Sequence, residues 1–522
     1  MSKQEFKNII DINANEADYY TLAVALHKTH KKKKLKLQGT FLEAIYRDTN
    51  RYMVIMKSTQ CGISEYLIVR AIARTRQGKN IFYVLPTFDL KNQFVKERID
   101  KSIAFTQYYR SLINKGDRKF TESTSLKMLL NGTMAYVGSN TEVAFVSFPA
   151  DDAIIDELDQ CNQDNLTMVP DRQAASEDKY TVKVANPTLN NFGIHEEYTN
   201  SDQKKWNTKC SNCGKYIYQD FFEHVVRQID DNVYIYRDKD FDPLGDKDIL
   251  PICNHCNKPY NRKASGEWVK TQEHRHSGYQ ISKMFSTAVE LRELTDKLQK
   301  GLVNDIEMQR LYNSDLGLPY VAKGSKVDEL MLDSCIVPDF IIPRKNEYRC
   351  VMGIDVGSVF NVVIREILPD GRLRLVFADE IYSDDGKELY ELYKNYEVVC
   401  AIIDGLPETR LSKKFSREFS GAFICYYGTE KKDSVNAKDK IVTVNRTQTL
   451  DAVKEYFLTQ TFLLPTNAKD IKNYYEQLTA STRVLNEKNK KYEWQEGSKA
   501  DHYMHAEGYC LTAKRILSMI GV

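Results

Sequence analysis

Residues 52–64 read Tyr-Met-Val-Ile-Met-Lys-Ser-Thr-Gln-Cys-Gly-Ile-Ser, an apolar run followed by a short polar turn. The apolar run Tyr52–Met56 predicts a buried strand, and the stretch from Ile63 to Arg74 predicts the helix after it. Apolar and amphipathic stretches go on alternating through residue 158, which is typical of a parallel α/β sheet. The further strands that we expect are Ile81–Leu85, Thr133–Val137, Ala153–Ile155 and Thr181–Ala185.

The turn between the first strand and its helix resembles a phosphate-binding loop. Such a loop directs backbone N–H groups at an anion near a helix N-terminus. Gly62 and Ser64 occupy the second-glycine and hydroxyl positions of the pattern G-x-x-x-x-G-K-[ST], but Ile63 stands at its lysine and Lys57 at its first glycine. We predict that Lys57, Gly62 and Ser64 bind a triphosphate; an ordinary strand-to-helix turn is the alternative.

An acidic pair follows a later strand of the same pattern. Asp156 and Glu157 end the apolar run Ala153–Ile155, about a hundred residues after the turn. In nucleotide hydrolases such an aspartate holds Mg²⁺ and the next glutamate orients or deprotonates the attacking water. Farther on, Asn186, Pro187 and Thr188 occupy the place of a coupling segment that senses the γ-phosphate. We therefore predict an ATPase centre that uses ATP with Mg²⁺, held in part by Asp156.

The eleven cysteines are unevenly placed, and four of them form two tight pairs. These four predicted zinc ligands are Cys210, Cys213, Cys253 and Cys256. Two Cys-x-x-Cys knuckles complete a tetrahedral four-thiolate site, and four sulfur ligands leave no open position for a substrate. The spacing predicts a structural Zn²⁺ in a ribbon inserted within the α/β pattern; unliganded thiols or two disulfides are the alternative.

A second α/β pattern begins near Arg349 and carries three aspartates at the ends of elements. Asp355 lies in the strand Val351–Gly357, Asp404 ends the apolar run from Val398, and Asp501 begins the last helix, which we expect to reach about Leu517. Carboxylates in this order can share two Mg²⁺ or Mn²⁺ ions that activate water for phosphodiester hydrolysis. The sequence thus predicts a metal-dependent nuclease with Asp355, Asp404 and Asp501 as catalytic ligands; each aspartate alone is also a common turn or capping residue.

Composition limits the classes of protein that remain. The 522 residues hold 74 Lys plus Arg and 72 Asp plus Glu, a net charge of +2, so any grip on nucleic acid depends on local patches. Two such patches are Lys31–Lys36 and a polar loop with Lys431, Lys432, Lys438, Lys440 and Arg446. The sequence has neither an apolar run of about 18 residues nor an N-terminal secretory pattern, and we expect an intracellular, multidomain protein without a membrane partner.

Together these motifs resemble the large terminase subunit of tailed bacteriophages, and the zinc knuckles resemble those of its lambda-type branch. The resemblance covers about residues 40 to 515. It extends to other stretches, namely Leu85-Pro86-Thr87, Lys96-Glu97-Arg98, Val137–Asn140, Tyr312–Pro319, and Val444–Thr447 leading to Asp451.

This resemblance implies a DNA-packaging motor. Such an enzyme hydrolyses ATP to move double-stranded DNA into a procapsid and cuts concatemeric DNA with an RNase H-like endonuclease. The implied partners are double-stranded DNA, the portal protein, a small terminase subunit and further copies of the chain in a ring, in the host cytoplasm and transiently at the procapsid. Family members often carry an arginine in the phosphate loop; here Gln60 stands there, and Arg51, Arg70 or a neighbouring subunit's arginine are the candidates for its role.

The expected architecture is α/β, with a P-loop-type ATPase, a zinc-ribbon insertion and an RNase H-like nuclease domain. The expected boundaries are 1–200 for the ATPase, 201–275 for the zinc ribbon, 276–325 for the rest of the ATPase and its lid, 326–346 for a linker and 347–522 for the nuclease. Two other functions remain open at this point: a helicase-nuclease of defence or repair, and a zinc-stabilised DNA-binding adaptor with a decayed ATPase.

Overall fold

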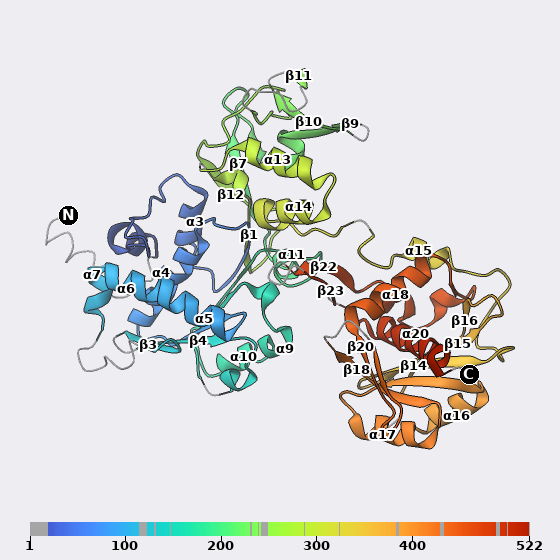
Figure 1. Cartoon of the computed structure of the whole chain (residues 1–522). Helices are drawn as coiled ribbons and strands as arrows, with labels where there is room; N and C mark the ends of the chain where they lie inside the picture. Colours follow the sequence, from blue (N-terminus) through green and yellow to red (C-terminus); the bar gives the residue numbers. More distant parts are fainter. Residues whose placement is uncertain are drawn as a thin grey trace. The chain divides into compact units, whose positions relative to one another are not determined.

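The computed structural model describes residues 19–113, 123–129, 132–146, 148–229, 232–237, 240–241, 249–286, 288–322, 324–382, 386–428, 433–486, 491–497 and 499–520. The chain divides into two compact units, Met1–Tyr320 and Val321–Val522, here called unit 1 and unit 2 (Figure 1). None of the described helices has both the length and the apolar character needed to cross a membrane.

Unit 1 is built on a seven-stranded sheet in the order β13-β1-β6-β5-β2-β4-β3. Its strands are β1 (Tyr52–Lys57), β2 (Ile81–Leu85), β3 (Leu126–Leu129), β4 (Gly132–Gly138), β5 (Asp152–Asp156), β6 (Tyr180–Ala185) and β13 (Ser277–Ile281). All neighbours run parallel except β3 and β4. The five strands expected from apolar runs all form, and the carboxyl ends of β1, β6 and β5 therefore lie side by side at one edge.

Helices cover both faces of this sheet. Because side chains alternate along a strand, Met53 and Ile55 of β1 pack into one core, and Val54 and Met56 pack into the other. The first face carries α2 (Tyr19–Thr21), η1 (Leu22–Leu26), α3 (Phe41–Arg47), α4 (Ile63–Arg76), α5 (Phe88–Phe94), η2 (Val95–Asp100), α6 (Lys101–Phe105) and α7 (Gln107–Ser111). The second carries η3 (Glu142–Phe145), η4 (Leu158–Gln160), α9 (Gln163–Leu166), α10 (Val169–Arg172) and α11 (Ile194–Thr199).

An inserted module follows α11, and the chain then returns to the sheet. The module contains a sheet of β12, β7 and β8, a second sheet of β11, β10 and β9, and the short helix α12. Their bounds are β7 (Lys205–Lys209), β8 (Tyr216–Tyr218), α12 (Phe221–His224), β9 (Val226–Ile229), β10 (Asn232–Arg237), β11 (Asp240–Phe241) and β12 (Gly266–Val269). After it come β13, η5 (Lys283–Phe285), α13 (Leu291–Gly301), α14 (Asp305–Arg310) and η6 (Leu311–Leu316).

Unit 2 is built on an eight-stranded mixed sheet in the order β19-β20-β18-β17-β14-β15-β16-β21. Antiparallel pairs join β14, β15 and β16, whereas β14, β17, β18 and β20 run parallel. The strands are β14 (Cys350–Val356), β15 (Phe360–Ile367), β16 (Leu373–Ile381), β17 (Val398–Asp404), β18 (Ala422–Gly428), β19 (Ser434–Asn436), β20 (Ile441–Asn445) and β21 (Phe462–Leu463), with a separate hairpin of β22 (Thr482–Asn486) and β23 (Lys491–Gln495).

Two layers of helices enclose the sheet of unit 2 (Figure 1). One core holds residues of α15 (Glu329–Asp333), α18 (Arg446–Leu458), α19 (Tyr474–Leu478) and α20 (His502–Ile520), with η7 (Ala468–Asp470). The opposite core holds residues of α16 (Lys387–Asn395) and α17 (Thr409–Glu418). Gly353 lets α20 approach β14 closely, because a Cβ there would lie 2.0 Å from the carbonyl oxygen of Ala506.

The segment expected as a linker, 326–346, belongs to the core of unit 2. Val327, Leu332, Phe340 and Ile342 are buried there. The backbone N–H of Val337 also donates to the carbonyl of Leu464 at 2.9 Å. The segment lacks a regular apolar period because it packs mainly as irregular chain around one short helix.

Candidate functional sites

The first site lies at the carboxyl edge of β1, β6 and β5. The Nζ atom of Lys57, at the end of β1, lies 2.9 Å from Oε1 of Glu157 and donates to Oδ1 of Asn186 at 2.8 Å. Residues a hundred positions apart in the sequence therefore meet around one ammonium group. In open α/β sheets this edge is where ligands bind.

Lys57 keeps its charge although it is almost fully buried. Burial lowers the pKa of Lys57, but the charges of Glu157, Cys61 and Asp156 outweigh that effect and raise it. The lysine is thus a fixed positive charge at the end of β1, as a group that neutralises phosphate must be.

The two adjacent acids diverge from the end of β5. Asp156 accepts a hydrogen bond from the hydroxyl of Tyr83 at 2.9 Å, whereas Glu157 turns to Lys57 with a left-handed backbone at φ 58°. Burial, and after it the charge of Glu157, raise the pKa of Asp156 to about 6. A cation beside Asp156 would relieve this cost, which fits the Mg²⁺ ligand expected at this position.

The turn after β1 has the backbone that an anion site requires. Gln60 and Gly62 have φ of 58° and 90°, and among the described residues none accepts a hydrogen bond from their amides. The preceding amides of Ser58 and Thr59 instead donate to the carbonyls of Ile281 and Ser314, both at 2.8 Å. The start of the turn is therefore anchored, while its later N–H groups and the first turn of α4, with Ser64, remain available to an anion.

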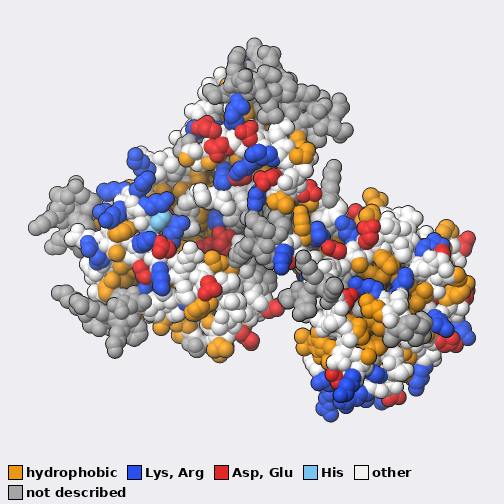
Figure 2. All heavy atoms as spheres, in the orientation of Figure 1, with side chains coloured by type: hydrophobic (Ala, Val, Ile, Leu, Met, Phe, Trp, Pro, Cys, Tyr) orange, Lys and Arg blue, Asp and Glu red, His pale blue; other side chains and the backbone are white. Residues whose placement is uncertain are grey.

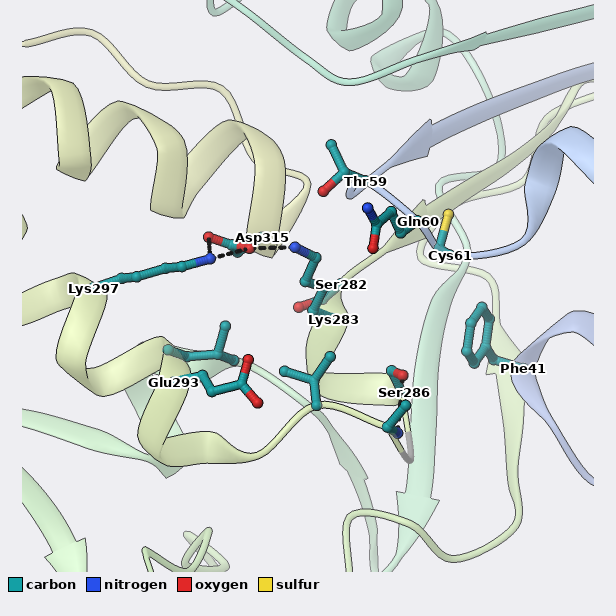
Figure 3. Close-up of a pocket in the computed structure, with 13 residues that line it drawn as sticks. Phe41, Thr59, Gln60, Cys61, Ser282, Lys283, Ser286, Glu293, Lys297 and Asp315 are labelled. Atoms are coloured by element: carbon teal, nitrogen blue, oxygen red, sulfur yellow. Dashed lines mark hydrogen bonds and ion pairs between the residues drawn. The ribbon is translucent and has the colours of Figure 1, made fainter. Parts of the chain in front are cut away.

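A pocket of about 280 Å³ borders the other side of this turn (Figure 3). Thr59, Gln60 and Cys61 line it, and Asp315 is held there by Lys283 at 2.5 Å and Lys297 at 2.8 Å. The pocket's remaining lining comes from Phe41 and from the segments of η5 and α13. It is the space beside the phosphate turn that can receive the rest of a nucleotide.

Asp159 was not expected from the sequence, yet it fixes the predicted coupling segment. Its carboxylate accepts hydrogen bonds from the N–H and the hydroxyl of Thr188, both at 2.8 Å, and from the N–H of Ile194 at 2.7 Å. Gly193 leaves room for it, because a Cβ there would lie 2.3 Å from Oδ1 of Asp159. The acidic strand end and the segment Asn186–Thr188 are thereby joined directly. The only sequence signal was a third acid two residues after Glu157.

The structure does not bring either arginine candidate to this site. Arg51 precedes β1, so it lies at the opposite end of a strand about 20 Å long, and it faces Asp178 at 3.7 Å. Arg70 is fully buried and donates to the hydroxyl of Tyr66 at 2.8 Å. Both are structural residues of unit 1, which corrects the expectation that one of them takes the place of the missing loop arginine.

The four paired cysteines form one cluster whose sulfur atoms all lie within 4.8 Å of one another. The Sγ atoms of Cys210 and Cys256 are 3.9 Å apart, and those of Cys213 and Cys253 are 3.8 Å apart. Tetrahedral Zn–S bonds of about 2.3 Å require sulfur separations of about 3.8 Å, so the cluster fits Zn²⁺. The matching turns after each pair, with Gly214 at φ 74° and Asn257 at φ 51°, aim both knuckles at the same point.

One thiol is already prepared for a metal. Burial raises the pKa of Cys210, but hydrogen bonds from the backbone N–H groups of Cys213 and Asn212 outweigh it and bring the pKa to about 7. A thiolate at neutral pH is the form that binds zinc.

The second site is an open pocket of about 390 Å³ in unit 2. Asp355 from β14, Asp404 from β17 and Asp501 before α20 all line it, as the order of these aspartates suggested. Further lining side chains that the sequence did not single out as catalytic are Tyr427, Arg446, Glu496, His502, His505 and Tyr509. Glu496 adds a fourth carboxylate, which came from an irregular stretch without a strand or helix signal.

Each aspartate of this pocket has a different partner. Nδ1 of His502 lies 2.9 Å from Oδ2 of Asp355, and the hydroxyl of Tyr509 donates to Oδ2 of Asp404 at 2.9 Å. Asp501 accepts a hydrogen bond from Ser481. The cations near Asp501 are His505 at 3.4 Å and Arg446 at 3.6 Å.

These partners set the charges differently. Burial, together with the charge of Asp355, raises the pKa of Asp404. For Asp501 burial acts in the same direction, but His505, Ser481 and Arg446 outweigh it and hold its pKa well below the usual range. Among the described residues only the cysteine cluster brings three or more ligand atoms within 4.8 Å, so the carboxylates surround the pocket instead of touching. That spread suits two ions about 4 Å apart.

The basic loop expected near this site is divided in the structure. Lys431 and Lys432 lie outside the described residues. The Nζ atom of Lys440 donates to the carbonyls of Ser416 and Phe419, both at 2.7 Å, at the end of α17. Arg446 lines the pocket beside Asp501. These side chains therefore do not form a single phosphate-binding patch.

Comparisons with known proteins agree with the two sites. Residues 37–272 match the model of the family "Phage terminase large subunit gpA, ATPase domain". No curated protein matches the chain.

Similar solved structures include three proteins of thermophilic phages. A full-length large terminase from a thermophilic bacteriophage is 12% identical over 90% of this chain and 94% of that one, with a TM-score of 0.30. The large terminase ATPase domain of Thermus phage P74-26 is 11% identical over 55% and 95%, with a TM-score of 0.33. The large terminase nuclease of phage G20c is 10% identical over 35% and 95%, with a TM-score of 0.26. These scores are low, and the family assignment rests on residues 37–272: this chain is a phage terminase large subunit of the gpA ATPase family.

Proposed function

We propose that the protein is the motor subunit of a viral DNA-packaging machine. Unit 1, as a P-loop-type ATPase, hydrolyses ATP to move double-stranded DNA into a procapsid. Unit 2, as an RNase H-like endonuclease, cuts concatemeric DNA. The observation that carries this proposal is the presence of two separate carboxylate sites, one in each unit, together with the gpA family match of residues 37–272.

In unit 1 each side chain has a distinct task. Lys57 and the N–H groups of the turn, with Gly62 and Ser64, hold the phosphates, and Asp156 holds the Mg²⁺ that accompanies ATP. Glu157 is released from Lys57 when phosphate takes its place and then orients the attacking water. Asn186, Pro187 and Thr188 transmit the loss of the γ-phosphate, since Asn186 contacts Lys57 and Thr188 is bound to Asp159.

The forward position of the lysine is compatible with a working site. A decayed nucleotide loop has no reason to keep a buried ammonium group against Glu157 and Asn186, because burying that charge is costly. These contacts favour an active ATPase over an adaptor that has lost the activity.

In unit 2, Asp355, Asp404 and Asp501 would hold two Mg²⁺ or Mn²⁺ ions. Such ions activate water and stabilise the leaving oxygen of a phosphodiester. His502 orients Asp355, and Tyr509 orients Asp404. The Zn²⁺ held by Cys210, Cys213, Cys253 and Cys256 has a structural role only. The proposed partners are double-stranded DNA, the portal protein, a small terminase subunit and further copies in a ring, in the host cytoplasm and at the procapsid.

Two substitutions in the full-length chain test whether the two sites are separable. We expect Glu157→Gln to lower ATP turnover by about 100-fold or more while cleavage of plasmid DNA continues. Asp355→Asn should abolish Mn²⁺-dependent cleavage while ATP turnover remains. Packaging is measured as DNA protected from external nuclease in the presence of procapsids and ATP, and it should fail with Glu157→Gln. Cleavage that disappears with Glu157→Gln, or ATP turnover that disappears with Asp355→Asn, would contradict two independent centres.

A further inference from the structure

The outer face of α17 carries a row of cations for which the structure describes no charge partner. Arg410, Lys413, Lys414 and Arg417 are all exposed, and their spacing of three, four and seven residues places them on one side of the helix. Figure 2 shows Lys and Arg side chains gathered over α17. No described carboxylate lies within ion-pair distance of any of the four, and Glu418 is the only acid within the helix.

This face is firmly built. On its inner side Phe415 is fully buried, and its ring contacts Tyr390, Tyr393 and Phe419. Lys440 binds the carbonyls at the end of the helix, where the helix dipole favours a cation. The four exposed charges are therefore held at fixed spacing instead of on a loose segment.

The helix begins next to the nuclease pocket. Leu406 and Pro407 line that pocket, and α17 starts at Thr409, five residues after Asp404. The hydroxyl of Ser412, in the first turn of the helix, donates to the backbone carbonyl of Asp404 at 2.5 Å. The position of α17 is thus tied to one of the proposed catalytic carboxylates.

The pocket itself offers little attraction to the phosphates that flank a cleavage point. Four of its lining side chains are carboxylates, namely Asp355, Asp404, Glu496 and Asp501. Its cationic side chains are already engaged: Arg446 and His505 lie beside Asp501, and His502 lies beside Asp355. Positive charge for the flanking duplex must then come from outside the pocket.

We propose that the face of α17 formed by Arg410, Lys413, Lys414 and Arg417 binds the phosphate backbone of double-stranded DNA and holds it at the nuclease pocket. This proposal rests on the nuclease function proposed above. From Arg410 to Arg417 the helix rises about 10 Å, and about 10 Å of duplex axis carries about six phosphate charges. Four cations over this length match the charge density of one side of the duplex, and contacts of this kind carry no base specificity.

The test uses full-length protein with three cations removed, Arg410→Gln, Lys413→Gln and Arg417→Gln together. Glutamine keeps helix propensity and leaves the stacked Lys414 in place. The matched control removes three other exposed cations of unit 2 that form no described ion pair, by Lys326→Gln, Lys345→Gln and Arg349→Gln. Binding of a fluorescent duplex of about 30 base pairs is followed by anisotropy over a range of salt, without added divalent ions.

We expect the triple α17 variant to bind the duplex more weakly and with a smaller salt dependence. Three lost phosphate contacts lower the slope of log K against log salt by about 2.7, so from about 50 to about 200 mM salt its affinity should fall about 40-fold less than that of the wild type. In Mn²⁺-dependent cleavage the apparent KM should rise while kcat stays near the wild-type value. ATP turnover without DNA should not change, and the control variant should match the wild type.

The other outcomes are distinguishable. If the wild type binds duplex and the triple α17 variant keeps the same affinity and salt slope, the proposal for α17 is overturned while the nuclease function stands. If the α17 variant and the control lose affinity equally, net charge and not this face governs binding. If only packaging with procapsids is lost, the face binds an acidic protein surface instead of DNA. A wild-type chain that neither binds nor cuts the duplex would overturn both proposals.

Discussion

At the residue scale, the ATPase centre depends on a lysine at an unusual position. Lys57 ends β1 instead of starting α4, yet its ammonium group reaches Glu157 and Asn186. The sequence allowed this prediction because Lys57, Asp156 and Glu157 each end an apolar run, and parallel strands bring such ends to one edge. Sequence reasoning could not find Asp159, because its role depends on the backbone N–H groups of Thr188 and Ile194, which become neighbours only in the folded chain.

Replacing Lys57 tests its role directly. We expect Lys57→Met to lower ATP turnover by about 100-fold or more, because the developing phosphate charge loses a fixed cation. A matched control is Lys183→Met, a lysine of the neighbouring strand β6 that pairs with Glu197 at 2.5 Å away from the phosphate turn. Steady-state phosphate release measures both variants. Equal activity in Lys57→Met and the wild type would show that another group binds the phosphates.

Asp159 predicts a pH dependence of stability. Burial raises the pKa of Asp159 to about 7, although Ile194 and Thr188 donate to its carboxylate. In the unfolded chain its pKa is about 4. The folded state therefore binds the proton more tightly, so this contribution to the free energy of unfolding is complete below about pH 4 and is lost as pH rises to about 7.

The variant Asp159→Asn does not titrate and isolates this contribution. Between about pH 5 and about pH 8 the wild type should lose roughly 2 to 3 kcal/mol of unfolding free energy relative to the variant. Denaturant titrations followed by the fluorescence of Trp206 and Trp268, both in unit 1, give the two free energies at each pH. A difference between variant and wild type that does not change with pH would mean that Asp159 is ionised throughout.

At the element scale, continuous apolar runs were predicted well and mixed ones were not. The expected strand Ile81–Leu85 has the bounds of β2, because it is apolar at every position and is buried on both faces. The strand β13, Ser277–Ile281, was not expected, since Ser277, Gly278 and Gln280 interrupt its apolar pattern. Its register with β1 and the hydrogen bond of Gln280 to the carbonyl of Leu316, at 2.8 Å, compensate for the weak local signal.

The contact between β14 and α20 predicts a strong effect from one methyl group. Gly353→Ala would place a Cβ 2.0 Å from the carbonyl oxygen of Ala506 and 2.5 Å from the nitrogen of Cys510, so helix and strand must separate. We expect a loss of about 1 to 3 kcal/mol or more in the unfolding free energy of unit 2, together with weaker DNA cleavage, because α20 follows Asp501 directly. The fluorescence of Trp494 reports the unfolding.

The control for this substitution is Gly357→Ala in the turn after the same strand. There the nearest atom to a new Cβ is the carbonyl oxygen of Val359 at 3.5 Å, an ordinary contact. This variant should unfold within about 0.5 kcal/mol of the wild type. If both alanine variants are equally stable, the close approach of α20 to β14 is not a constraint on this strand.

At the scale of the whole molecule, metal content tests the inserted module. We expect about one Zn²⁺ per chain, lost in Cys253→Ser and kept in Cys335→Ser, whose thiol is also buried but lies outside the cluster. The module should then unfold at lower temperature, because its local core, around Ile217 and Tyr260, is small. Zinc measured by a chromogenic chelator gives the stoichiometry. Full zinc content in Cys253→Ser would contradict a four-thiolate site.

The division of the chain into two units leads to the broadest prediction. The buried residues of unit 1 form apolar cores that end at Leu316, and those of unit 2 begin at Val327, so no described apolar core is shared between them. Each unit therefore buries enough apolar surface to fold by itself. We expect residues 321–522, produced alone, to unfold cooperatively and to cut DNA with Mn²⁺, and residues 1–320 to hydrolyse ATP.

The boundary chosen for these fragments decides the outcome. A nuclease fragment that starts at residue 347, the expected domain start, would lack Val327, Leu332, Phe340 and Ile342, which fill the core of unit 2. Losing several buried apolar side chains at about 1.5 to 3 kcal/mol each exceeds the stability of a typical domain, so this shorter fragment should not fold. Circular dichroism and denaturant titration of the two fragments measure this difference. If both fold equally well, the segment 326–346 is a linker after all and its packing contributes nothing to unit 2.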